Sequence, residues 1–129
     1  MARSQNYSSR KEADSIADRL KKDLLSRIIY STDASAYREM PEAIYYPKCE
    51  EDIVDLVKYA AESGCSIIPR AAGTSLAGQV VGSGIVADIS KYMKEILEVN
   101  VEQRWVRVQP GVVLDELNNY LKPFGLFFG

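Results

Sequence analysis

The stretch from residue 70 to residue 84 has the composition in this sequence that best suits ligand chemistry. It holds four glycines, the pair Ala71-Ala72 and three hydroxyl residues. Glycine and alanine let a backbone approach a ligand closely, and successive backbone N–H groups form a concave site for an anion. Thr74 and Ser75 offer hydroxyl groups as extra donors. The stretch therefore suits phosphate or pyrophosphate, although composition alone favours a plain connecting loop about as strongly.

The spacing of the glycines excludes two other phosphate-binding loops. After Gly73 and Gly78 the sequence continues with Gln79-Val80, whereas a P-loop requires Lys followed by Ser or Thr. A Rossmann dinucleotide turn requires Gly-x-Gly-x-x-Gly at the start of a helix, and this stretch has no such pattern. The interpretation therefore depends on the elements around the stretch.

Composition also removes several kinds of chemistry. The chain of 129 residues has no histidine, which excludes His-dependent triads and the commonest metal ligand. The spacing of Cys49 and Cys65 fits neither a disulfide framework nor a metal site, so both are predicted to be buried apolar residues. A net charge of −2 gives no basic excess for binding nucleic acid. The hydropathy predicts no transmembrane segment and no signal peptide, hence a cytoplasmic chain.

The elements before the glycine-rich stretch predict a strand-helix-strand unit. A capping-box pattern at residues 9–12 and apolar residues at three- and four-residue steps predict a helix over residues 10–28. Residues 43–47 and 65–69 predict short strands, which we expect to pair in parallel across a helix over residues 52–63. Gly64 ends that helix, whose inward face is predicted to be Ile53, Val54, Val57, Ala60 and Ala61.

The elements after the stretch predict one more strand, a hairpin and a helix. Residues 85–89 form the strand, residues 96–99 and 105–109 the hairpin, and residues 113–121 an amphipathic helix closed by Pro123. In the second arm, Val106 and Val108 face opposite to Trp105 and Arg107. The fold class is therefore α+β, with a small mixed sheet flanked by helices. The apolar run at residues 124–129 predicts a piece of a longer protein, with self-association through this edge.

The ordered combination of these pieces resembles the N-terminal FAD-binding half of the vanillyl-alcohol-oxidase-type flavoproteins, the FAD-binding PCMH-type domain. The pieces are residues 69–78, 85–90, 96–99 and 106–112. The likeness is closest to the FAD-linked oxidase branch with D-lactate dehydrogenases and glycolate oxidase subunits, and it covers roughly residues 30–129. It implies an N-terminal helix and connection over residues 1–37. It also implies that residues 38–129 are the first part of the domain, incomplete at the C-terminus.

The resemblance also implies which residues contact FAD. The loop wraps the FAD pyrophosphate, mainly with backbone N–H groups, through Arg70, Ala71, Ala72, Gly73, Thr74, Ser75, Leu76, Gly78 and Gln79; Pro110 and Gly111 lie beside the cofactor. The loop of the family usually has more glycine, and alanine resists left-handed backbone angles. An Arg at position 70 is as often solvated or ion-paired, and residues 108–112 equally suit a plain strand-to-helix corner. Tyr30, Asp33 and Tyr37 match a segment of the family and are predicted to be structural.

The function implied by the resemblance is oxidation of a 2-hydroxy acid, with hydride transfer to FAD. Covalent attachment in this family uses His or Cys, so a loop without either predicts non-covalent FAD. Catalytic residues of the family come later in sequence, so this piece alone is expected to be inactive and to need the remainder of the parent chain. One alternative is a stand-alone module that binds another phosphate-bearing ligand. The other alternative is the related reductase that acts on a nucleotide-linked enolpyruvyl sugar. The loop of that reductase usually has Gly-Ser-Asn where this chain has Gly73-Thr74-Ser75.

Overall fold

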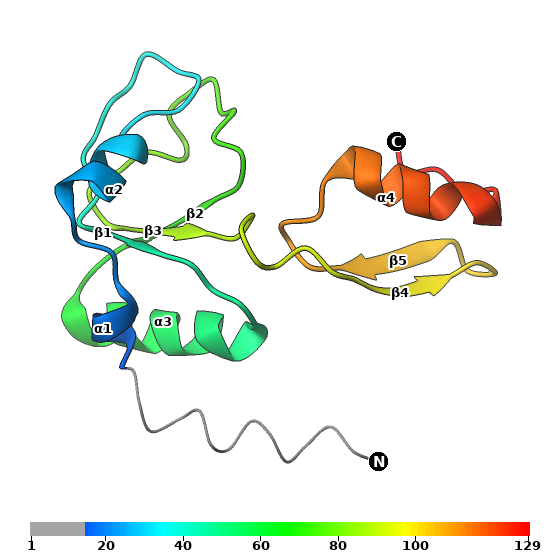
Figure 1. The fold of residues 1–129 in the computed structure, drawn as a ribbon, viewed down its shortest axis with the longest axis horizontal. Coiled ribbons are helices and arrows are strands. Elements are labelled where there is room, and N and C mark those ends of the chain that lie inside the picture. Colours follow the sequence, from blue (N-terminus) through cyan, green and yellow to red (C-terminus); the bar gives the residue numbers. More distant parts are fainter. Residues whose placement is uncertain (1–14) are drawn as a thin grey trace.

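The computed structural model describes residues 15–129, which form an α+β fold (Figure 1). This confirms the predicted fold class. The capping-box pattern at residues 9–12 lies outside the described residues. The elements are α1 (Ile16–Arg19), α2 (Leu24–Ile29), β1 (Ala43–Tyr45), α3 (Glu50–Ser63), β2 (Ile67–Arg70), β3 (Ile85–Asp88), β4 (Ile96–Asn100), β5 (Trp105–Val108), α4 (Leu114–Leu121) and the 3₁₀ turn η2 (Lys122–Phe124).

A three-stranded parallel sheet is the centre of the fold, with the strand order β1-β3-β2. Val86 of β3 is the register partner of both Ile44 and Ile68. The predicted direct pairing of β1 with β2 is therefore wrong, because β3 lies between them. All four residues of β3 are buried, as a central strand requires. Pro69 has no backbone N–H to donate, which suits β2 to the edge of the sheet.

Alternate residues of the strands build the core against α3. Tyr45 and Ile85 are fully buried on this face, where they pack with Leu56 of α3 and with Leu20. Gly64 ends α3 at φ 68°, as predicted. The predicted inward face of α3 is wrong in part, because the buried stripe is Asp52, Leu56 and Ala60, while Val54, Val57 and Ala61 are exposed.

The predicted single helix through residue 28 is wrong among the described residues. Lys21 is extended and pairs with the outer edge of β1, since its N–H donates to Ile44 O at 2.8 Å and its carbonyl accepts from Ile44 N at 2.9 Å. The helix restarts at α2, where the Asp23 carboxylate accepts from Ser26 N at 2.9 Å. The strand edge and the new cap together explain the break.

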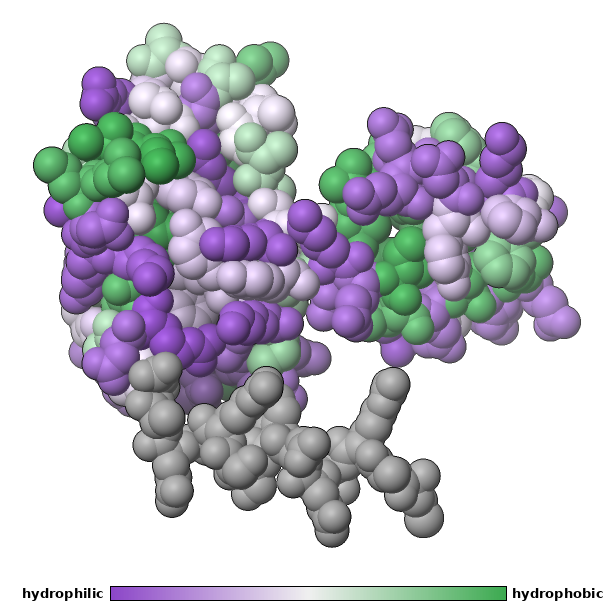
Figure 2. Space-filling model, in the orientation of Figure 1, coloured by the Kyte–Doolittle hydropathy of each residue, from purple (hydrophilic) through white to green (hydrophobic). Residues whose placement is uncertain are grey.

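The two short helices are bound to the sheet in different ways. Arg19 of α1 makes an ion pair of 2.7 Å with Asp52 of α3. The side chains of α2 leave an exposed apolar patch, the green region over this helix in Figure 2, where Leu24 is 64% and Ile29 58% exposed. Leu24 and Ile28 belong to the apolar residues at three- and four-residue steps that predicted a packing helix, and their exposure shows that this part of the prediction is wrong.

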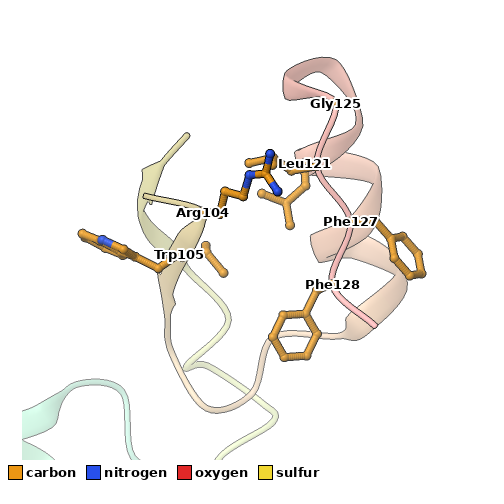
Figure 3. A pocket seen from close by; sticks show the side chains of 8 residues that line it. Arg104, Trp105, Leu121, Gly125, Phe127 and Phe128 are labelled. Carbon is orange, nitrogen blue, oxygen red and sulfur yellow. The ribbon is translucent and has the colours of Figure 1, made fainter. Parts of the chain in front are cut away.

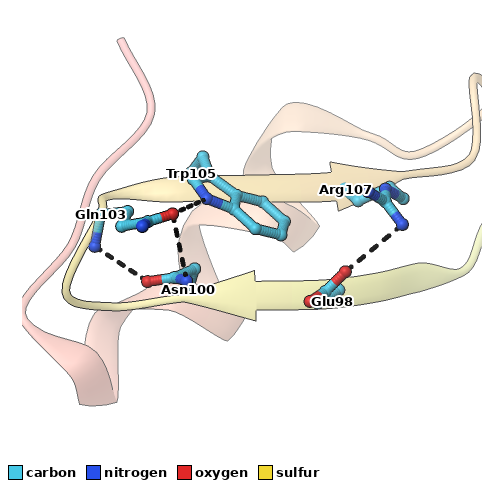
Figure 4. Close-up of polar contacts among 5 residues, drawn as sticks. All are labelled: Glu98, Asn100, Gln103, Trp105 and Arg107. Atoms are coloured by element: carbon cyan, nitrogen blue, oxygen red, sulfur yellow. Dashed lines mark hydrogen bonds and ion pairs between the residues drawn. The ribbon is translucent and has the colours of Figure 1, made fainter.

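The antiparallel hairpin β4–β5 and α4 form a lobe beside the sheet (Figure 1). Its turn is closed by Gln103, whose N–H donates to Asn100 Oδ1 at 2.8 Å and whose side-chain oxygen accepts from Trp105 Nε1 at 2.9 Å (Figure 4). Arg107 lies 3.4 Å from Glu98 on the exposed face. Val106 and Val108 are half-buried, while Trp105 and Arg107 are exposed, so the predicted alternation is confirmed. On α4, Leu117 and Leu121 are buried.

Candidate functional site

The carboxyl ends of the three parallel strands meet at one edge of the sheet, and the glycine loop (residues 71–84) leaves from there. Arg70 is the last residue of β2, Asp88 is the last residue of β3, and Tyr46 follows β1. Arg70 and Asp88 are register partners, so both side chains project from the same face of the sheet. Parallel sheets bind ligands outside the carboxyl ends of their strands, which makes this edge the candidate site.

The glycine loop contains no helix or strand and relies on two glycines for its shape. Gly73 has φ 70° and Gly78 has φ 72°, both in the left-handed region that favours glycine. Ala71 and Ala72 do not need that region, because Arg104 is the one non-glycine residue of the described part with positive φ. The alanine pair is therefore compatible with this loop.

The backbone of the glycine loop presents a run of unused donors. Among the described residues, the N–H groups from Ala71 to Leu76 donate no hydrogen bond. Ser75 is already engaged, since its Oγ accepts from Gln79 N at 3.2 Å and donates to Gln79 Oε1. Thr74 is exposed and its hydroxyl has no partner in the described part of the chain. Consecutive free N–H groups on a small-residue loop are the donor set that a phosphate or pyrophosphate needs.

Arg70 lies under the glycine loop in a fixed position. Its guanidinium stacks on the Tyr30 ring at 5.2 Å, and its Nη1 donates to Tyr30 O at 3.4 Å. A Cβ built on Gly73 would lie 2.9 Å from Arg70 Cζ. Gly73 is therefore required both by its backbone angle and by the close approach of Arg70.

The side chains of Tyr30 and Asp88 join α2 to the end of β3. Tyr30 Oη donates to Asp88 Oδ2 at 2.5 Å. The other carboxylate oxygen accepts from the N–H of Ser90 at 2.9 Å and from its hydroxyl at 2.6 Å. Burial and the hydrogen bond to Asp88 raise the pKa of Tyr30 far above its ordinary value, so the phenol stays protonated and donates. Asp88 has its donors in place and is a structural anchor.

Sequence reasoning did not single out Asp88. The available signal was a carboxylate inside the apolar run 85–89, since a buried charge needs partners. The sequence did not indicate which residue binds this carboxylate, because Tyr30 lies 58 residues before Asp88.

Pro110 and Gly111 form a tight corner between β5 and α4. Pro110 is exposed, whereas Gly111 is buried and its N–H donates to Met93 O at 2.8 Å. A Cβ at Gly111 would lie 2.7 Å from that same oxygen. Gly111 therefore contacts the segment after β3 and not the glycine loop. Close packing against that segment explains why a glycine occupies this position.

A cavity of about 510 Å³ lies in the hairpin lobe, away from the glycine loop. Figure 3 shows that it is lined by the hairpin on one side and by α4 and the residues after it on the other. Its lining residues are Arg104, Trp105, Val106, Leu121, Gly125, Leu126, Phe127 and Phe128. Aromatic and aliphatic side chains therefore predominate in this cavity, which offers no donor set like that of the loop.

Both cysteines are half-buried, so their predicted burial is wrong. Cys49 lies at the start of α3. Cys65 precedes β2, at the opposite edge of the sheet from the glycine loop, and its Sγ donates to Glu42 Oε2 at 3.3 Å. This hydrogen bond raises the pKa of the Cys65 thiol above its usual value.

Within residues 15–129, no acidic and cysteine side chains cluster as metal ligands, and no helix is long and apolar enough to cross a bilayer.

Comparisons of this sequence with a family pattern and with curated proteins agree with one another. The sequence pattern of a family described as an FAD binding domain matches residues 41–129. The chain is 47% identical over 105 residues to D-2-hydroxyglutarate dehydrogenase of Pantoea ananatis, covering 79% of this chain and 10% of that protein. It is 38% identical over 111 residues to the mitochondrial D-lactate dehydrogenase [cytochrome] of Kluyveromyces lactis, covering 83% of this chain and 19% of that protein.

Solved structures agree on the fold. An alkyldihydroxyacetonephosphate synthase matches with a TM-score of 0.74 at 22% identity, over 95% of this chain and 25% of that one. A 4-ethylphenol oxidase from Gulosibacter chungangensis matches with a TM-score of 0.68 at 18% identity, over 86% of this chain and 23% of that one. The chain thus spans a small part of each relative.

Proposed function

Because this chain belongs to the FAD binding domain family, we propose that its glycine loop binds the pyrophosphate of FAD without a covalent bond. One observation carries the proposal: the six consecutive backbone N–H groups from Ala71 to Leu76 have no partner among the described residues. Each N–H supplies a hydrogen bond to a phosphate oxygen where water is partly displaced. Arg70 adds a positive charge under the loop, and Thr74 adds a hydroxyl.

We further propose that the chain is part of a flavin-dependent oxidoreductase that oxidises a 2-hydroxy acid of the D-lactate, glycolate or D-2-hydroxyglutarate type. The support is identity of 33–47% to relatives named as D-2-hydroxyglutarate dehydrogenase, D-lactate dehydrogenase and glycolate oxidase subunit. FAD, when bound, accepts the hydride, and the protein binds and orients it. The contribution of this chain is to hold the pyrophosphate, so the groups that contact the acid belong to other parts of the enzyme.

The geometry gives each part of the loop a separate task in that role. Gly73 and Gly78 supply the left-handed backbone angles of the loop, and the hydrogen bonds between Ser75 and Gln79 hold its second half. Tyr30 and Asp88 fix the end of β3 beside it. Cys65 lies at the far edge of the sheet, which supports a cofactor held by hydrogen bonds and not by a thioether.

Titration of the flavin-free, full-length protein with FAD tests the proposal. We expect saturable one-to-one quenching of flavin fluorescence, with ADP competing because it carries the same pyrophosphate. Turnover is then assayed with D-lactate, glycolate and D-2-hydroxyglutarate and an artificial electron acceptor. Binding of ADP or inorganic pyrophosphate without any binding of FAD would favour a module for another phosphate-bearing ligand.

A further inference from the structure

A turn from the N-terminal part of the chain lies against the glycine loop. This segment, residues 31–37, is called the Asp33 turn here. Figure 1 shows it in cyan beside the green loop, and the N–H of Ala34 donates to Gly73 O at 3.1 Å. The ring of Tyr37 covers Gly78, because a Cβ built there would lie 2.8 Å from Tyr37 Cδ2. The turn thus contacts both glycines of the loop that have positive φ, Gly73 and Gly78.

The base of the Asp33 turn is itself fixed. Ser31 is 1% exposed, its hydroxyl donates to Ile28 O at 2.7 Å, and its carbonyl accepts from Glu39 N at 3.0 Å. The turn is therefore joined to α2 at one end and closed on itself at the other. A segment held in this way can support a loop that contains no helix or strand of its own.

The carboxylate of Asp33 closes the turn through hydrogen bonds to Ser35. Its Oδ1 accepts from Ser35 N at 2.8 Å and from the Ser35 hydroxyl. Hydrogen bonds from the Ser35 hydroxyl and N–H, the charge of Arg70 and the N–H of Val80 lower the pKa of Asp33, so it is ionised at neutral pH. Its Oδ2 is buried and has no hydrogen bond among the described residues. The negative charge of Asp33 therefore interacts with the positive charge of Arg70, the residue that precedes the loop.

We propose that Asp33 and Tyr37 are positioning residues that hold the glycine loop in the conformation that binds the FAD pyrophosphate. The inference rests on the proposed function. The contacts from the turn reach the loop at Gly73 and Gly78, and they leave the N–H groups of residues 71–76 free for a ligand. A loop ordered before binding loses less entropy when the ligand arrives, so the affinity is higher. This role goes beyond a purely structural one for Asp33 and Tyr37.

The test measures FAD affinity and the stability of the flavin-free form in the full-length protein. Asp33→Ala should weaken FAD binding about tenfold, which equals about 1.4 kcal/mol. Tyr37→Ala should weaken it severalfold, while Tyr37→Phe, which keeps the ring on Gly78, should restore wild-type affinity. The thermal midpoint of the flavin-free protein should change little, because Tyr37 is 63% exposed and the loop is at the surface.

Asp23→Ala is the matched control. Asp23 is also an aspartate that accepts a backbone hydrogen bond, from Ser26 N at 2.9 Å, but it caps α2. Its loss should lower the thermal midpoint as much as Asp33→Ala does, or more, and leave FAD affinity within about twofold of wild type. A loss of affinity that merely follows a loss of stability would appear in all three alanine variants.

The outcomes separate the inference from the proposed function. If wild type binds FAD and both Asp33→Ala and Tyr37→Ala bind it as tightly as Asp23→Ala, the positioning role is wrong. Tighter binding by Asp33→Ala would also overturn it, since Asp33 would then act by repelling the pyrophosphate. If Asp33→Ala fails to fold, the Tyr37→Ala and Tyr37→Phe pair decides. Failure of the wild-type protein to bind FAD would overturn the proposed function itself.

Discussion

Replacement of Gly73 by valine should remove FAD from the protein. Gly73 has φ 70°, and a Cβ there would lie 2.9 Å from Arg70 Cζ. The left-handed region costs an L-residue roughly 1–2 kcal/mol, and displacing Arg70 from the Tyr30 ring costs about 0.5–1 kcal/mol more. The loop relieves this strain by changing its conformation. FAD binding must then restore the original conformation, and this lowers the affinity. A total of about 1.5–3 kcal/mol corresponds to a loss of affinity of roughly 10- to 150-fold.

Two control variants separate the site from general strain. Gly64→Val has the same kind of backbone strain, at φ 68°, but its Cβ meets nothing within 4 Å and it lies at the end of α3. It should lower the free energy of unfolding without changing FAD affinity. Lys22→Ala changes an exposed side chain in the connection between α1 and α2 and should alter neither quantity.

The assay is the ratio of flavin to protein absorbance after purification, followed by FAD titration of the flavin-free form. Circular dichroism shows whether each variant is folded. A folded Gly73→Val protein that keeps its full flavin would refute the reasoning, because the glycine loop would then be a connector and not a ligand site.

Three further outcomes follow from the structure. The isolated 129-residue chain should bind FAD weakly or not at all, because it spans 10–19% of its relatives; submicromolar one-to-one binding in a fluorescence titration would contradict this. The same isolated chain should self-associate through the exposed Phe127 and Phe128, and Phe127→Glu should reduce the mass measured by sedimentation; an unchanged mass would exclude this edge. Glu42 raises the pKa of the Cys65 thiol, so less thiolate is present at pH 8 and alkylation of Cys65 by iodoacetamide is slow. Glu42→Gln should accelerate this alkylation, and an equal rate would show that the hydrogen bond has no effect.

Local patterns were sufficient for most of the helices and strands but not for their arrangement. Gly64 ends α3 and Val106 alternates with Arg107 because such features depend on a few neighbouring residues. The position of β3 between β1 and β2 depends on contacts between distant residues. The helix predicted through residue 28 failed for a similar reason, since the strand edge at Ile44 takes the backbone hydrogen bonds of Lys21.

The candidate site also has a part that the sequence predicted and a part that it did not. The glycine loop was predictable because its composition restricts what it can do, and its position after β2 followed from the strand pattern. The contacts of the Asp33 turn with Gly73 and Gly78 were not predictable. They require residues far apart in the chain to meet, and no local spacing encodes that meeting.

The central position of β3 affects how the chain folds during synthesis. Within the part of the chain described by the structure, apart from the single bridge between Lys21 and Ile44, β1 and β2 pair only with β3, so residues 43–70 leave the ribosome before the strand that joins them. Until residue 88 has emerged, two apolar strands and one amphipathic helix exist without a sheet. Pairings between residues distant in the chain form slowly, and unpaired strands expose edges that aggregate. We therefore expect the nascent protein to depend on chaperones between the synthesis of β1 and that of β3.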